Sequence, residues 1–128
     1  MSGVTLNQSD TQISRDDQLK INKFSRTNMK AHELRRDIKK IAEELETLED
    51  ASMLIEESFG EDLKLVLGEC LIDVDEDGAN AIHAEIKKEK QNNKLSLEVE
   101  LARAEEEMKD LKSYLYARFG KAINLEED

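Results

Sequence analysis

The sequence predicts a mostly α fold, an antiparallel two-helix coiled coil (α-hairpin) with a β-hairpin at its base. Two charged, proline-free segments of similar length show helical periodicity, and the stretch between them, about residues 62–75, alternates like a strand. Charged residues make up 38% and aromatic residues 4% of the 128 positions, too few large apolar side chains for a compact globular core. Because the connecting stretch is short, the second helix must double back along the first.

The first helix is expected over about residues 15–59. Residues 1–14 are polar and lack periodicity, so we expect a disordered N-terminal tail there. Ser14 followed by Asp17 is an S-x-x-D helix-start signal, and Gly60 supplies a stop. Between them the apolar residues recur in steps of three and four, which is the seam of a coiled coil. The uninterrupted part of this seam is Ala31, Leu34, Ile38, Ile41, Leu45, Leu48, Ser52, Ile55 and Phe59.

The stretch at about residues 62–75 is expected to form the β-hairpin, with Gly68 and Glu69 as its two-residue turn. This turn places Leu67 opposite Cys70, Val66 opposite Leu71 and Leu65 opposite Ile72. Both faces of such a ribbon are apolar, and a lone two-stranded ribbon is barely stable in water, so it needs other strands. We therefore predict a subunit-assembly site made of Leu65, Val66, Leu67, Gly68, Cys70, Leu71 and Ile72.

The second helix is expected over about residues 77–119, ended by Gly120 and followed by a short C-terminal tail. It opens in the acidic turn 75–77, any residue of which could cap it. Its apolar seam fades at residues 89–94, which an antiparallel alignment places opposite roughly 43–47. We expect that section of the coiled coil to open easily.

The acidic segment Asp73–Gly78 matches the first half of an EF-hand calcium loop. The twelfth position of that loop, which needs a bidentate Glu, is Ala84. The favoured interpretation is an acidic strand exit that caps the second helix.

Other function classes find little support. The net charge of −11 argues against nucleic acid or an anionic membrane as a partner. The single Cys70 excludes an internal disulfide, and His32 and His83 lie in different helices. The glycines are isolated, so no phosphate-binding loop is predicted. We expect no enzymatic activity, no bound metal and no cofactor. Because the sequence shows neither a signal peptide nor a membrane span, we expect an intracellular protein.

Apolar residues also gather at both ends of the expected coiled coil, which an antiparallel pair brings to one tip. Seam packing accounts for Phe24 and Leu115, but poorly for the later residues, some of which lie beyond Gly120. An exposed apolar patch usually binds a partner. The predicted tip site consists of Leu19, Ile21, Phe24, Leu115, Tyr116, Phe119, Ile123 and Leu125.

The segments INKFSRTN (21–28) and LYARFGKAINLEED (115–128) resemble the two end motifs of the β-type prefoldin family, and the segment 67–72 resembles its hairpin. The resemblance implies a heterohexamer of two α-type and four β-type subunits, with the hairpins forming a β-barrel platform. It implies that the tips hold unfolded client proteins, typically actin and tubulin, and pass them without ATP to the cytosolic chaperonin. It also implies a cytoplasmic protein, with a nuclear pool left open.

Two alternatives remain from the residues themselves. One is a coiled-coil spacer or tether in another complex, whose tip has no client role. The other is a calcium-responsive switch, which rests on the incomplete loop at Asp73–Gly78.

Overall fold

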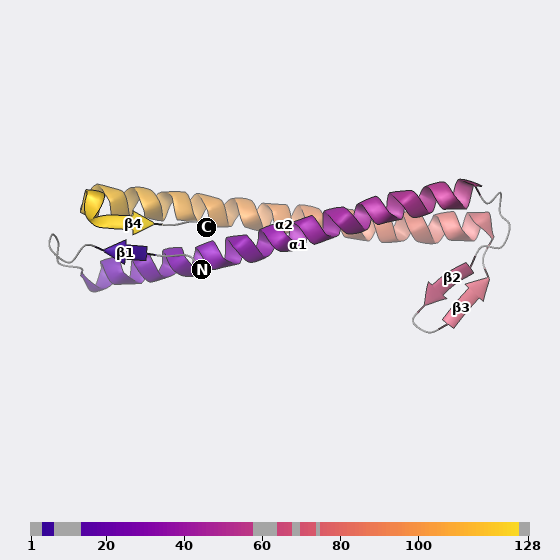
Figure 1. The fold of residues 1–128 in the computed structure, drawn as a ribbon, viewed down its shortest axis with the longest axis horizontal. Helices are drawn as coiled ribbons and strands as arrows, with labels where there is room; N and C mark the ends of the chain where they lie inside the picture. Colours follow the sequence, from indigo (N-terminus) through magenta and orange to yellow (C-terminus); the bar gives the residue numbers. More distant parts are fainter. Residues whose placement is uncertain (1–3, 7–13, 58–63, 68–69, 74, 126–128) are drawn as a thin grey trace. The chain divides into compact units, whose positions relative to one another are not determined.

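The computed structural model describes residues 4–6, 14–57, 64–67, 70–73 and 75–125. Two long helices joined through a β-hairpin confirm the predicted fold class. The elements in chain order are β1 (Val4–Leu6), α1 (Arg15–Glu57), β2 (Lys64–Leu67), β3 (Cys70–Asp73), α2 (Glu76–Phe119), the 3₁₀ turn η1 (Gly120–Ala122) and β4 (Ile123–Leu125) (Figure 1). The expected last residues of the first helix, 58 and 59, lie outside the described residues.

Both helices begin at capping residues indicated by the sequence. The Asp17 backbone amide donates to Ser14 Oγ at 3.1 Å, and the Ser14 amide donates back to Asp17 Oδ2 at 3.4 Å. This reciprocal pair is a capping box, which satisfies amides that lack a partner within the helix. At α2 the Gly78 amide donates to Asp75 Oδ1 at 2.7 Å. The interpretation of the acidic turn as a helix cap is therefore confirmed for Asp75.

The chain divides into two compact units, and the first comprises residues 1–37 and 97–128. Its core combines buried side chains of α1 with the C-terminal part of α2 and with β4. Lys23 and Glu107 form an ion pair across the two helices at 2.8 Å, and Arg35 and Glu105 form another at 3.2 Å. The buried apolar cluster consists of Ile21, Phe24, Ala31, Ala104, Met108, Leu115, Phe119, Ala122, Ile123 and Leu125.

The second unit comprises residues 38–96. Its seam residues in the two helices are half-buried, as expected where two helices pack against each other. Glu44 lies opposite Lys90 at 2.7 Å and Glu49 opposite Lys87 at 3.4 Å. His83 Nε2 also lies 2.6 Å from the carbonyl oxygen of Leu48. The Glu44–Lys90 pair confirms the predicted alignment of residues 89–94 with residues 43–47.

The hairpin between the helices pairs β2 with β3 in the predicted register. Leu67 pairs with Cys70, Val66 with Leu71, and Leu65 with Ile72. The predicted turn at Gly68 and Glu69 lies outside the described residues. The alternation of apolar residues, together with the two positions expected between the strands, was therefore sufficient to predict which residues pair across the hairpin.

The two chain ends differ from the expectation. Val4–Leu6, within the segment expected to be disordered, forms β1 and pairs antiparallel with β4, with Thr5 opposite Asn124 (Figure 1). The expected C-terminal tail forms η1 and β4. Gly120 has φ +58°, the left-handed conformation predicted for a helix stop, and this residue redirects the chain after Phe119. A three-residue strand is too short to produce a detectable alternating pattern, which explains the missed elements.

Candidate functional site

The predicted tip residues come together in the first unit. Ile21, Phe24, Leu115, Phe119, Ile123 and Leu125 are buried in one cluster, and Tyr116 is partly buried against it. Leu19 differs from them, because 54% of its surface is exposed. The sequence thus predicted which residues gather at this end of the coiled coil. Their role in binding a client stays a prediction.

The chain after Gly120 closes over the end of this cluster. Ile123 and Leu125 are 3% and 5% exposed, whereas Asn124 between them faces outward. The Leu125 amide donates to Tyr116 Oη at 3.3 Å, which fixes β4 to the last turns of α2. Tyr116 therefore combines an apolar ring packed on the core with a hydroxyl that holds the strand.

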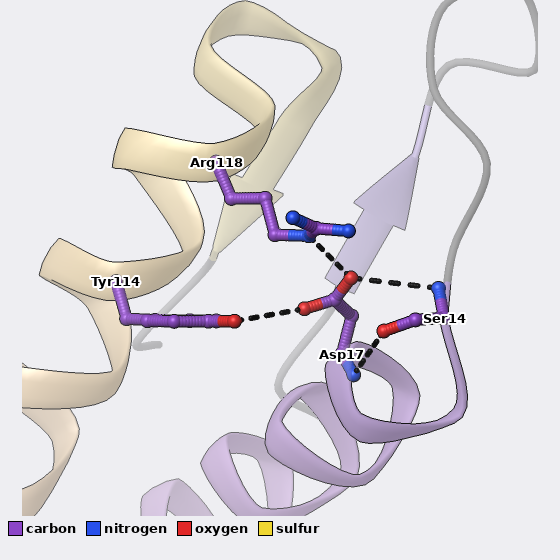
Figure 2. A network of polar contacts seen from close by, with 4 residues as sticks. All are labelled: Ser14, Asp17, Tyr114 and Arg118. Atoms are coloured by element: carbon purple, nitrogen blue, oxygen red, sulfur yellow. Dashed lines mark hydrogen bonds and ion pairs between the residues drawn. The ribbon is translucent and has the colours of Figure 1, made fainter.

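A polar network joins the start of α1 to the end of α2. The Asp17 carboxylate accepts hydrogen bonds from Arg118 Nε and from Tyr114 Oη, the latter at 3.3 Å (Figure 2). Asp17 is 1% exposed, so its negative charge is removed from bulk water and needs these partners. Figure 2 shows Arg118 and Tyr114 approaching the carboxylate from α2, while Ser14 approaches it from the start of α1.

These contacts lower the pKa of Asp17 below its ordinary value of 3.8. Burial acts in the opposite direction and raises it, but the hydrogen bonds from Ser14 and Arg118 and the positive charge of Arg118 outweigh that effect. The carboxylate is therefore charged at neutral pH.

Sequence reasoning assigned Asp17 to the helix start and missed Tyr114 and Arg118. The available signal was an acid in the first turn of one helix and a base in the last turn of its antiparallel partner.

Several large apolar side chains of the first unit lie exposed around this core. Leu19 and Met29 belong to α1, and Val99 and Tyr114 belong to α2. Tyr114 is 43% exposed, and Lys20 Nζ lies 4.9 Å from the centre of its ring. An apolar surface bordered by charged groups can hold an apolar segment without a deep pocket.

The predicted assembly residues form the backbone pairs of β2 and β3, except Gly68, which lies outside the described residues. A two-stranded sheet leaves the outer backbone groups of each strand available for further pairing. Strand addition is thus chemically open to this hairpin. The assignment of these residues to subunit assembly stays a prediction.

Asp75 uses its carboxylate to cap α2, as the 2.7 Å contact with the Gly78 amide shows. Within the part of the chain that the structure describes, no three His, Cys, Asp or Glu residues group as metal ligands. The helices of the described ranges include none long and apolar enough to span a bilayer.

Comparison with known proteins gives a consistent result. A family model described as "Prefoldin subunit" matches residues 18–122. The chain is 31% identical to prefoldin subunit 4 of Homo sapiens over 121 residues, covering 93% of this chain and 90% of the relative. It is 34% identical to probable prefoldin subunit 4 of Dictyostelium discoideum (92% and 90% covered) and 33% identical to prefoldin subunit 4 of Saccharomyces cerevisiae (91% and 91% covered). No solved structure matches the chain significantly.

Proposed function

Because the chain belongs to the prefoldin subunit family, we propose that it is a subunit of a hexameric prefoldin co-chaperone that holds unfolded proteins. The subunit works without ATP and catalyses no reaction. Its partners are the α-type and β-type subunits of the hexamer, unfolded or nascent proteins of the actin and tubulin type, and the cytosolic chaperonin that receives them. It acts in the cytoplasm.

The observation that carries this proposal is the cluster of apolar residues at the end of the coiled coil formed by the first unit. Leu19 and Tyr114 are exposed there beside a core that contains Phe24, Leu115 and Phe119. An unfolded protein presents irregular apolar segments, which dispersed apolar side chains can hold and release without fuel. Exposed residues make the first contact, and local opening of the first unit would add the buried ones.

The hairpin supports the second part of the proposal. β2 and β3 pair over only four residues each, and both predicted faces are apolar. A ribbon of this size is barely stable alone, so pairing with hairpins of other subunits would complete it. In the hexamer this chain supplies one hairpin to the platform and one coiled coil to the client-holding surface.

One observation favours the tether as a second candidate function. Phe24 and Leu115 are fully buried, as expected of side chains that only seal the end of a coiled coil. A tether needs no exposed apolar surface, whereas a client-holding tip does. The two functions therefore differ in what Leu19 contributes.

The test compares two exposed leucines in hexamers reconstituted with the other subunits. Leu19→Gln changes the proposed surface, and Leu95→Gln changes a side chain of the second unit that is 59% exposed. We expect Leu19→Gln to raise the concentration of hexamer needed to prevent aggregation of denatured actin by about two- to threefold, because the other tips share the load. Leu95→Gln should leave it unchanged. Equal protection by both variants, with hexamers intact by mass measurement, would favour the tether.

A further inference from the structure

We propose that β1 occupies a strand-binding edge of β4 and that an extended segment of an unfolded client replaces β1 there. This inference rests on the proposed function and specifies how the tip recognises a client. The observation behind it is the pairing of Val4–Leu6 with Ile123–Leu125, which joins the two ends of the chain (Figure 1).

The strand β4 is held by contacts that do not involve β1. Its alternate residues Ile123 and Leu125 are buried against α1 and α2 residues of the core. The Leu125 amide donates to Tyr116 Oη, and Gly120 sets the turn that leads into the strand. Loss of β1 therefore leaves β4 in place with one edge open for backbone pairing.

The pairing of β1 with β4 is weak by comparison. Each strand has three residues, and among the residues that the structure describes the sheet contains these two strands alone. An isolated two-stranded sheet is marginally stable in water. Residues 7–13 connect β1 to the start of α1, and a short connection of this kind gives an effective concentration in the millimolar range. β1 is thus a weak competitor that is always present.

A client segment has the chemistry to replace β1. Strand addition uses main-chain hydrogen bonds, and every residue except proline has an amide hydrogen to donate. The alternate side chains of the added strand then determine which client segments are preferred. An unfolded protein is rich in extended apolar segments. Once the hexamer holds it at other tips, its local concentration also reaches the millimolar range, so it can compete with β1. This gives release without fuel, because β1 returns when the client folds.

The experiment opens the edge by a double substitution, Thr5→Pro/Leu6→Pro, in the full chain. Proline has no amide hydrogen, and adjacent prolines remove donors from both edges of β1, whichever edge faces β4. The matched control is Thr11→Pro/Gln12→Pro, which places the same two prolines outside β1. Deletion of residues 1–6 is a second way to remove the strand. Circular dichroism checks that the helices persist in each variant.

The probe is a fluorescent peptide with the sequence of residues 1–10 of this chain, and binding is measured by anisotropy. We expect the peptide to bind the Thr5→Pro/Leu6→Pro variant about three- to fivefold more tightly than the wild type, because β1 no longer occupies the edge. The control variant should behave as the wild type. In the reconstituted hexamer, denatured actin should displace the peptide from the variant.

Three results would overturn the proposal. Equal peptide affinity for variant and wild type would show that β4 is not the acceptor. Persistent peptide binding in the presence of held actin would show that the client does not use this edge. Association of the variant chains with one another through β4 would assign the edge to a second copy. Failure of wild-type hexamer to hold actin at all is a different result, because it overturns the proposed function and leaves the peptide measurement readable.

Discussion

Asp17 and Arg118, 101 positions apart in the chain, form an ion pair that joins the first turn of α1 to the last turn of α2 (Figure 2). The Asp17 side chain is almost fully buried, whereas the Arg118 side chain is 45% exposed. The same carboxylate completes the capping box with Ser14 and accepts from Tyr114. One side chain thus links the start of one helix to the end of the other, beside the apolar core of the first unit.

The first prediction concerns the stability that Asp17 provides. Asp17→Asn keeps the shape of the side chain but removes its charge, so it weakens the bond to Arg118 and the capping box together. We expect the thermal midpoint of the full chain, followed by circular dichroism, to fall by several degrees. Asp16→Asn is the control, because Asp16 is an exposed acid in the same helical turn. Equal midpoints for the two variants would contradict a stabilising role for the network.

The second prediction concerns pH. The pKa of Asp17 is lower in the folded chain than its ordinary value of 3.8, so the unfolded chain takes up this proton first as the pH falls. The stabilisation is therefore fully present above pH 3.8 and is lost as the pH falls through the lower, folded pKa. The difference in thermal midpoint between wild type and Asp17→Asn should be largest near neutral pH and should shrink steadily below pH 3.8. A difference that stays constant down to strongly acidic pH would mean that Asp17 acts through packing alone.

The third prediction concerns the core of the first unit. Leu115 is fully buried, so Leu115→Ala leaves a cavity and should lower the free energy of unfolding by about 2–5 kcal/mol. Val99→Ala, at an exposed position of the same helix, should change it by less than about 0.5 kcal/mol. Denaturant titration measures both. A small effect at Leu115 would indicate that the end of the coiled coil is open in solution.

Most of the fold was predictable because its signals are local. The a/d spacing of residues such as Leu34 and Ile38 defines a seam within α1, and Gly120 by itself marks the stop of α2. The register of β2 and β3 follows from the alternation of their apolar residues and from the two positions, 68 and 69, that separate the strands in the sequence. Each of these features depends on residues close together in the chain.

The missed features depend on residues that are far apart. The bond from Arg118 to Asp17 requires the exact alignment of two helices that the chain joins at their opposite ends. The pairing of Thr5 with Asn124 connects two short segments without a pattern of their own. The burial of Ile123 and Leu125 follows from the packing of β4 against distant residues of α1 and α2, so the sequence identified these residues as a group without indicating their exposure.

The fourth prediction concerns the acidic turn before α2. Asp75 accepts from the Gly78 amide, so Asp75→Ala should lower the free energy of unfolding by about 1 kcal/mol, as loss of a helix cap does. Asp77→Ala, in the same turn, is the control.

Calorimetric titration of the chain should detect no calcium site tighter than the millimolar range of weak EF-hand modules, since Ala84 replaces the closing ligand. Micromolar calcium binding that Asp75→Ala abolishes would restore the calcium-switch alternative.

The last prediction concerns the hairpin and the assembly proposed for it. Ile72 pairs with Leu65 at the centre of the β2–β3 ladder. If neighbouring hairpins cover this ribbon in the hexamer, Ile72→Lys places a charge without a counter-charge in the interface and weakens association by several kcal/mol. Glu69→Lys introduces the same side chain at the expected turn, at a position that already carries a charged residue, and it should assemble normally. Co-expression with the other subunits, followed by mass measurement of the purified complex, distinguishes the two variants. We expect helical chains outside the complex for Ile72→Lys and full-size hexamer for Glu69→Lys. Recovery of Ile72→Lys in hexamer at wild-type yield would show that assembly uses another surface.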